Sequence, residues 1–244
     1  MKNIWIIAKR ELSGYFNSPI AYVFIVIFLL LMGFFTFMMG GFFRSNEASL
    51  GGFFVWHPWL YLFLIPAVAM RMWAEERRTR TIELLLTLPV TLPQAILGKF
   101  LAGWLFIGIA LLLTFPMVIT VCYLGDPDIG QIIAGYIGSF LLAGCYLSVG
   151  SFASSLTRNQ VVAFIICLVI CLFFVVAGWA PVTDALASSV PLSVANFIAS
   201  LSFMYRFDSV QRGVIDTRDL IYYASVITFM LAATSVVLTS RKAS

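Results

Sequence analysis

The sequence contains six long apolar runs in which no Asp, Glu, Lys or Arg occurs. A helix of about 20 residues crosses the hydrocarbon core of a bilayer and satisfies its own backbone hydrogen bonds there. The runs therefore predict an all-α integral membrane protein with six transmembrane helices. They cover residues 20–43, 53–70, 100–124, 132–156, 161–180 and 220–239.

The composition supports a membrane protein built as one domain, 1–244. The chain is 61% hydrophobic and 11% charged, which leaves too little polar surface for a soluble fold. The first apolar run is longer than the core of a cleavable signal peptide, so we expect it to remain as a membrane anchor. No basic tract suited to nucleic acid is present, and the lipid bilayer is the expected partner.

Lysine and arginine collect in alternate connections, which predicts the orientation because cytoplasmic loops are enriched in these residues. With the N-terminus inside, the two ends of the chain, the stretch 71–99 and Arg158 carry most of the positive charge. The opposite connections hold the remaining residues: Arg44, Arg206, Arg212 and Arg218. We therefore expect both termini in the cytoplasm.

The segment 181–219 separates the last two apolar runs. Its part 182–205 is long enough to span the bilayer, but it is rich in serine and contains Pro191 near its middle. Proline inside a helix removes a hydrogen bond and clashes with the preceding turn. We predict short re-entrant helices that enter the outer leaflet and return. A seventh span is the alternative, and it would move Arg241 and Lys242 to the outside.

The apolar runs lack the residues that several functional classes need. Ion-coupled carriers place ionisable side chains at membrane depth, and these runs hold none. His57 is the one histidine, and we expect it to be an interfacial anchor rather than a proton relay. No Gly-rich phosphate loop occurs. We therefore expect a chain that is not itself an enzyme, binds no cofactor or metal, and receives its energy from a partner.

Residues 1–17 have the pattern of an amphipathic helix lying in the headgroup plane, so 1–18 is predicted to be an interface helix. Its apolar face consists of Ile4, Trp5, Ala8, Leu12, Tyr15 and Phe16, and its polar face of Lys2, Lys9, Arg10, Ser13 and Asn17. Ser18 is expected to cap the following helix, with Pro19 as its first residue. The helix is either a simple anchor or a contact with a partner.

The connection 71–99 joins the second and third runs and is predicted to be a cytoplasmic loop. A helical continuation of the second run would carry four charged residues beyond the headgroups: Glu75, Glu76, Arg77 and Arg78. At the other end, Thr91 and Gln94 have the spacing of a capping box. This box predicts where the third membrane helix begins.

A short helix is predicted in the middle of this connection, over 82–88. Thr81 can cap it, Glu83 is favourable in its first turn, and Pro89 ends it. Its apolar residues are Leu84, Leu85, Leu86 and Leu88. They are buried either against the chain's own helices and the headgroups or in a groove on a soluble partner.

Three stretches of the sequence resemble the permeases of type-2 ABC exporters. The first is Pro66-Ala-x-x-Met70-Arg71, then Glu75-Glu76, then Thr81-Ile-Glu83-Leu-Leu-x-x-x-Pro89-Val. The second is Lys9-Arg-Glu-Leu-x-x-Tyr-Phe-x-Ser-Pro19. The third is Arg206-Phe-x-Ser-x-x-Arg-Gly-Val-Ile-Asp216 with Asp219-Leu-x-Tyr222. Within this family the chain is most similar to the gliding-motility permease, and more distantly to the nitrous-oxide-reductase-maturation permease.

The resemblance implies a permease subunit of an ATP-driven exporter in a bacterial inner membrane. It implies a second permease subunit, identical or related, and partner ABC ATPases that alone hold ATP and Mg²⁺. It also implies an interface helix that includes Lys9, Arg10 and Glu11. An ABC-linked scaffold of a motility or secretion assembly, without transport of its own, is the alternative.

The resemblance further implies that residues 75–89 form a coupling helix seated on the ATPase. Its polar contacts would come from Glu75, Glu76, Arg77 and Glu83, its packing from Leu84, Leu85 and Leu86, and its end from Pro89, and Arg78 and Thr81 belong to the same interface. The family usually has glycine where this chain has Arg80. Glycine permits a sharper turn or a closer approach, so the usual bend and fit of this helix do not carry over directly to this chain.

Overall fold

The computed structural model describes residues 2–43, 47–79, 90–189 and 192–240. Within these ranges every regular element is a helix, which confirms the all-α prediction. The helices are α1 (Lys2–Phe16), α2 (Pro19–Phe34), the π-helical η1 (Phe35–Met39), α3 (Gly51–Phe54), α4 (His57–Ala69), α5 (Arg71–Arg78), α7 (Leu92–Leu112), α8 (Phe115–Leu124), α9 (Ile129–Leu156), α10 (Gln160–Val176), α11 (Ala180–Ser189), α12 (Leu192–Ser200), α13 (Phe203–Gln211) and α14 (Thr217–Ser240).

Two helix starts follow the sequence pattern. Ser18 accepts a hydrogen bond from the backbone N–H of Ile20, and Pro19 is the first residue of α2. At the start of α7, the side chain of Gln94 accepts a hydrogen bond from the backbone N–H of Thr91 at 3.3 Å. Both predicted caps are confirmed, because each depends only on residues within one helical turn.

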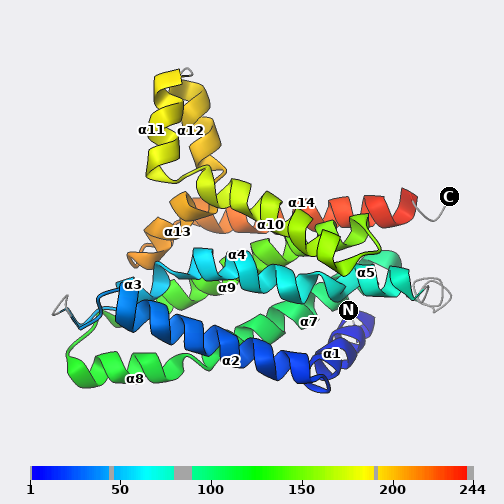
Figure 1. Ribbon diagram of the computed structural model, residues 1–244, viewed down its shortest axis with the longest axis horizontal. Helices are drawn as coiled ribbons and strands as arrows, with labels where there is room; N and C mark the ends of the chain where they lie inside the picture. Colours follow the sequence, from blue (N-terminus) through cyan, green and yellow to red (C-terminus); the bar gives the residue numbers. More distant parts are fainter. Residues whose placement is uncertain (1, 44–46, 80–89, 190–191, 241–244) are drawn as a thin grey trace.

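The long helices form one elongated bundle (Figure 1). α1, α5 and the C-terminal part of α14 gather at one end of it, which we call the α1 end. α3, α13 and the end of α8 lie toward the opposite end, which we call the α13 end. The chain therefore passes between the two ends repeatedly, as expected for a multi-pass membrane protein.

In the described ranges, five helical stretches are long and apolar enough to cross a membrane. They are Pro19–Met39, Gly51–Arg78, Leu92–Leu124, Ile129–Leu156 and Thr217–Ser240. The predicted run 161–180 corresponds to α10, an apolar helix of 17 residues, which is at the lower limit of about 17 residues for a span. The multi-pass architecture is confirmed, and the count of six spans stays a prediction.

α9 occupies the centre of the bundle and contacts α4, α5, α7, α10, α13 and α14. Small residues on membrane helices let their neighbours approach closely. A Cβ atom at Gly150 would lie 2.2 Å from the Cβ of Ala69 on α4. One at Gly135 would lie 2.4 Å from the ring of Phe54 on α3. The central position of α9 therefore depends on its glycines.

The segment between α10 and α14 forms three short helices. α11 and α12 pack on each other and project sideways from the bundle (Figure 1). α13 returns to the bundle and buries Phe203, Phe207 and Val210 against its neighbours. Helices of 10, 9 and 9 residues form in the described parts of this segment, and none of the candidate spans found in the described ranges lies there. The alternative of a seventh span over 182–205 therefore gains no support. The re-entrant path stays a prediction.

His57 corrects one expectation. Its side chain is fully buried, and its Nδ1 atom lies 3.2 Å from the carbonyl oxygen of Phe53. The rings of Phe53, Phe54 and Tyr61 surround it, and Phe207 of α13 lies against it from a second direction. The expected role of interfacial anchor is therefore wrong, because these aromatic side chains enclose the imidazole inside the bundle.

Candidate functional site

α1 packs against α7 and forms part of the α1 end. Ile7 and Ala8 are buried in this contact, whereas Trp5 is 60% exposed. A Cβ atom at Gly98 would lie only 2.7 Å from Ile7, so glycine at this position lets the two helices meet. The amphipathic helix is where it was predicted, but its buried face contains Ile7 instead of Trp5.

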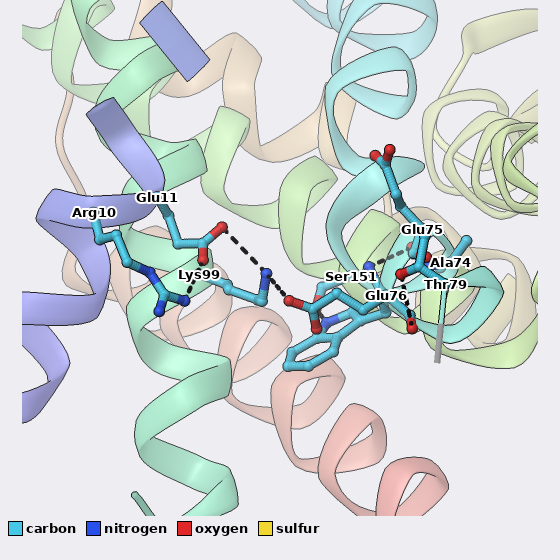
Figure 2. A network of polar contacts seen from close by, with 10 residues as sticks. Arg10, Glu11, Ala74, Glu75, Glu76, Thr79, Lys99 and Ser151 are labelled. Atoms are coloured by element: carbon cyan, nitrogen blue, oxygen red, sulfur yellow. Dashed lines mark hydrogen bonds and ion pairs between the residues drawn. The ribbon is translucent and has the colours of Figure 1, made fainter. Parts of the chain in front are cut away.

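Lys99 of α7 connects α1 to α5 (Figure 2). Its Nζ atom lies 3.2 Å from Oε2 of Glu11 on α1 and 2.8 Å from Oε1 of Glu76 on α5. Arg10 binds the other carboxylate oxygen of Glu11 at 2.9 Å. One ammonium group thus joins two carboxylates from two other helices. We call Glu11, Glu76 and Lys99 the three-helix junction.

The junction is largely shielded from solvent. The Lys99 side chain is only 7% exposed, and its Nζ atom also lies 5.5 Å from the centre of the Trp73 ring. A buried ammonium group is costly unless it is paired and hydrogen-bonded. The two carboxylates provide that pairing, and the indole ring adds a cation–π contact. Removal of either carboxylate therefore weakens the contact between the helices.

Sequence reasoning missed the role of Lys99, which it treated only as one positive charge of the connection 71–99. The structure places this lysine inside α7, which begins at Leu92. One signal was available in the sequence. The capping box at Thr91 and Gln94 marks the helix start, so a lysine two turns later, between Gly98 and Phe100, already lies within the packed part of the helix.

A second set of polar contacts joins α5 to α9. The Ser154 hydroxyl accepts hydrogen bonds from the backbone N–H groups of Trp73 and Ala74, both at 3.0 Å, and donates to the carbonyl of Met70. The Trp73 indole N–H donates to the Ser151 hydroxyl at 3.0 Å. These bonds satisfy backbone N–H groups in the first turn of α5, which have no acceptor within that helix because α5 begins as a separate helix after α4. They fix α5 to the centre of the bundle.

The described part of the predicted coupling segment consists of Glu75, Glu76, Arg77 and Arg78, which lie on α5. The first three are half-buried and Arg78 is exposed. Arg77 donates a hydrogen bond to the carbonyl oxygen of Ser155 near the end of α9, where a cation also interacts favourably with the helix dipole. α5 is thus the predicted helical continuation of the second run.

The remaining predicted coupling residues lie outside the described residues. They are Thr81, Glu83, Leu84, Leu85, Leu86 and Pro89, and Arg80 lies with them. Their roles stay predictions. The helices that flank this stretch are α5 and α7, and the three-helix junction joins these two helices directly.

The charges of the junction act on the acidity of Glu11. Burial of Glu11 works to raise its pKa, but the nearby Lys99 ammonium and Arg10 guanidinium groups outweigh that effect. The pKa of Glu11 therefore lies below its ordinary value. The carboxylate stays ionised at neutral pH, so its bond to Lys99 is present under ordinary conditions.

A cavity of about 590 Å³ lies beside the junction. Its apolar wall comes from α2 and α4 and includes Ile20, Val23, Ile27, Leu64, Ala67 and Val68. Its polar wall includes Arg71, Glu75 and the three residues of the junction. In the described part of the chain, no group of three or more His, Cys, Asp or Glu side chains is placed to hold a metal ion.

A different buried ion pair lies toward the α13 end. Arg206 of α13 donates to Asp219 of α14 at 3.1 Å, and the Ser209 hydroxyl donates to the other carboxylate oxygen at 2.6 Å. The Arg206 guanidinium also lies 5.4 Å from the centre of the Tyr222 ring. All four residues belong to one of the stretches that resembled the exporter permeases. The contact attaches α13 to the start of α14.

Comparison with known proteins identifies the family. A search of curated proteins gave no match. A family described as ABC-2 family transporter protein matches residues 5–240, a range that contains most of α1, the junction and the described helices from α2 through α14. The specific resemblance to the gliding-motility and nitrous-oxide-reductase-maturation permeases has no further support from these comparisons. The match covers nearly the whole chain, and the chain therefore belongs to the ABC-2 family of membrane transporter proteins.

Proposed function

We propose that the chain is the transmembrane permease subunit of an ATP-driven exporter. Separate ABC ATPases bind and hydrolyse ATP, and the chain couples that reaction to the movement of a substrate across the bacterial inner membrane. The observation that carries the proposal is the three-helix junction, because it attaches α5, the helix that leads into residues 80–89, to both α1 and α7.

The contacts of α5 supply a route for the coupling. The backbone of α5 is bonded to Ser154 of α9, and its Glu76 is bonded to Lys99 of α7. A displacement of α5 by an ATPase is therefore passed to the central helix and to the interface helix together. The membrane helices then exchange between two conformations, and ATP changes their relative populations.

Membrane orientation follows from the same proposal. The α1 end carries Lys9, Arg10, Arg77 and Arg78 and faces the cytoplasm, where the ATPases bind. The α13 end then faces outward. In this arrangement α10 serves as a sixth, short span, α11 and α12 re-enter from the outside, and a second permease subunit completes the pathway.

The proposal is tested by purification of the tagged full-length chain from membranes together with its ATPase. We expect Leu85→Asp to abolish co-purification of the ATPase or to lower the ATPase activity of the complex roughly tenfold, since a buried charge without a partner costs several kcal/mol. Arg218→Gln, at an exposed position on α14, is the control and is expected to leave both unchanged.

A second measurement locates the same segment. In a chain whose exposed native Cys122 is replaced by serine, a cysteine introduced as Glu83→Cys is expected to react with a membrane-impermeant maleimide only after the cells are opened. Labelling in intact cells would place the segment outside and overturn the proposal. Unchanged co-purification together with unchanged ATPase activity in Leu85→Asp would overturn it as well.

A further inference from the structure

The cavity beside the junction has two unlike walls. Ile20, Val23 and Ile27 line it, and these side chains are also 49%, 55% and 41% exposed. The apolar wall is therefore continuous with the outer apolar face of α2. A volume of about 590 Å³ lies in the range of small-molecule sites. The cavity is open to a molecule that comes from the lipid side.

Arg71 is the first charged group on the polar wall. Among the described residues it has no ion-pair partner, and its Nε atom is buried without a hydrogen bond. A buried N–H group without an acceptor is costly. Arginine binds phosphate through two parallel hydrogen bonds. A phosphate group in the cavity would supply the missing partner.

The acidic groups of the cavity divide into two kinds. Glu11 and Glu76 are engaged by Lys99. Glu75 also lines the cavity, but no ion pair in the described part of the chain involves it. It follows Arg71 by four residues, which is about one helical turn or 6 Å farther along α5, away from α4. The order from the apolar wall outward is thus apolar, cationic, anionic.

We propose that this cavity binds an amphiphile whose headgroup is a phosphate followed by a primary ammonium group, as in phosphoethanolamine. The phosphate pairs with Arg71, the ammonium pairs with Glu75, and the hydrocarbon chains lie along α2 and α4. The sequence of charges in such a headgroup matches the sequence of charges along α5. The site does not depend on ATP or on the proposed coupling.

The test measures lipid binding to the full-length chain by native mass spectrometry, without nucleotide. The probes are phosphatidylethanolamine, phosphatidylglycerol, which lacks the ammonium, and phosphatidylcholine, whose ammonium carries no hydrogen to donate. Because a charge-assisted hydrogen bond distinguishes the first probe, we expect it to bind roughly tenfold more tightly than the other two.

Four variants separate the parts of the site. Arg71→Gln is expected to weaken all three lipids, whereas Arg71→Lys, which keeps the charge, retains the order of affinities. Glu75→Gln is expected to remove the preference for phosphatidylethanolamine and leave the other affinities unchanged. Ala67→Phe fills the cavity and is expected to exclude every lipid. Arg158→Gln, which removes an exposed positive charge from the loop between α9 and α10, is the control and binds like the parent chain.

A separate experiment tests whether the bound lipid is transported or is a resident lipid of the bilayer. Addition of ATP to the complex with its ATPase distinguishes a transported lipid, which is released, from a resident bilayer lipid, which is retained; both results agree with the site. Equal affinity for the three probes would overturn the proposal. So would parent-like binding in Arg71→Gln and Ala67→Phe. Because binding is measured without nucleotide, failure here leaves the proposed coupling function intact.

Discussion

The two ends of the bundle each contain a buried ion pair, but the pairs join very different parts of the chain. At the α1 end, Glu11 and Lys99 are separated by 88 residues, and Lys99 also reaches a third helix through Glu76. Toward the α13 end, Arg206 and Asp219 are only 13 residues apart. The first pair connects distant helices, whereas the second attaches a short helix to its successor.

This difference indicates different roles for similar chemistry. A contact between consecutive helices restrains one local turn and has little influence on the rest of the bundle. A contact shared by three separate helices responds when any of them moves. The α1 end therefore has an arrangement that suits the proposed coupling, and the α13 end has the arrangement of a local attachment.

The largest expected effect comes from Lys99→Met. This change leaves the carboxylates of Glu11 and Glu76 facing each other without their shared cation. A charge-assisted hydrogen bond contributes about 1.5–3 kcal/mol, so we expect the ATPase activity of the complex that depends on the permease to fall roughly tenfold or more. The measurement is ATP hydrolysis by the co-purified complex in lipid nanodiscs.

The matched control for Lys99→Met is Asp219→Asn at the other end of the bundle, which also breaks a buried ion pair. We expect this variant to lower the thermal stability of the chain while the ATPase activity per folded complex stays near that of the parent. Lys99→Met combined with Glu76→Gln is expected to recover part of the activity, because the second change removes the repulsion between the carboxylates of Glu11 and Glu76. Equal loss of activity in Lys99→Met and Asp219→Asn would show that the two ends do not differ.

An intermediate effect is expected for Ser154→Ala. The change leaves the backbone N–H groups of Trp73 and Ala74 without their acceptor, and a buried unsatisfied donor costs about 1–3 kcal/mol. We expect a lower melting temperature and a severalfold loss of coupled ATPase activity. Ser148→Ala is the control on the same helix, since the Ser148 hydroxyl donates only to Cys145 one turn earlier in α9. A Ser154→Ala variant with the parent's stability and activity would argue against the α5–α9 contact as part of the route.

The smallest effect is a dependence of the α1 contact on pH. The pKa of Glu11 is lowered in the folded chain, so its stabilising contribution is complete above the ordinary value of 4.5 and disappears as the pH falls below it through the folded pKa. Spin labels at Ser13→Cys and Leu97→Cys would report the distance between α1 and α7. We expect that distance to increase below about pH 4.5. Glu11→Gln should remove the pH dependence, and a constant distance in the parent chain would contradict the prediction.

Features that depend on nearby residues were predicted well from the sequence. The apolar runs gave the membrane helices, Ser18 and Pro19 gave the start of α2, and Thr91 with Gln94 gave the start of α7. Each is fixed within one or two helical turns or by the average polarity of about 20 residues. Three-dimensional neighbours play no part in these features.

The tertiary structure alone decided the roles of single polar residues. Lys99 was one positive charge among many in the sequence, but the packing of α1 and α5 on α7 made it the centre of a junction. His57 was expected at the membrane surface, but the rings of Phe53, Phe54 and Tyr61 pack around it and Phe207 of α13 lies near it, so that it is buried.

The chain thus determined by itself that it is helical, apolar and membrane-spanning, because those properties depend on local pattern and on the cost of exposing the backbone to lipid. Which buried charges meet was decided only in the folded bundle. The charge pair of Glu11 and Lys99 joins positions 88 residues apart, and the hydrogen bond from the backbone N–H of Ala74 to the Ser154 hydroxyl joins positions 80 apart. Helix periodicity carries no information over such separations, since it reports only which face of a helix is apolar and not which helix will cover it.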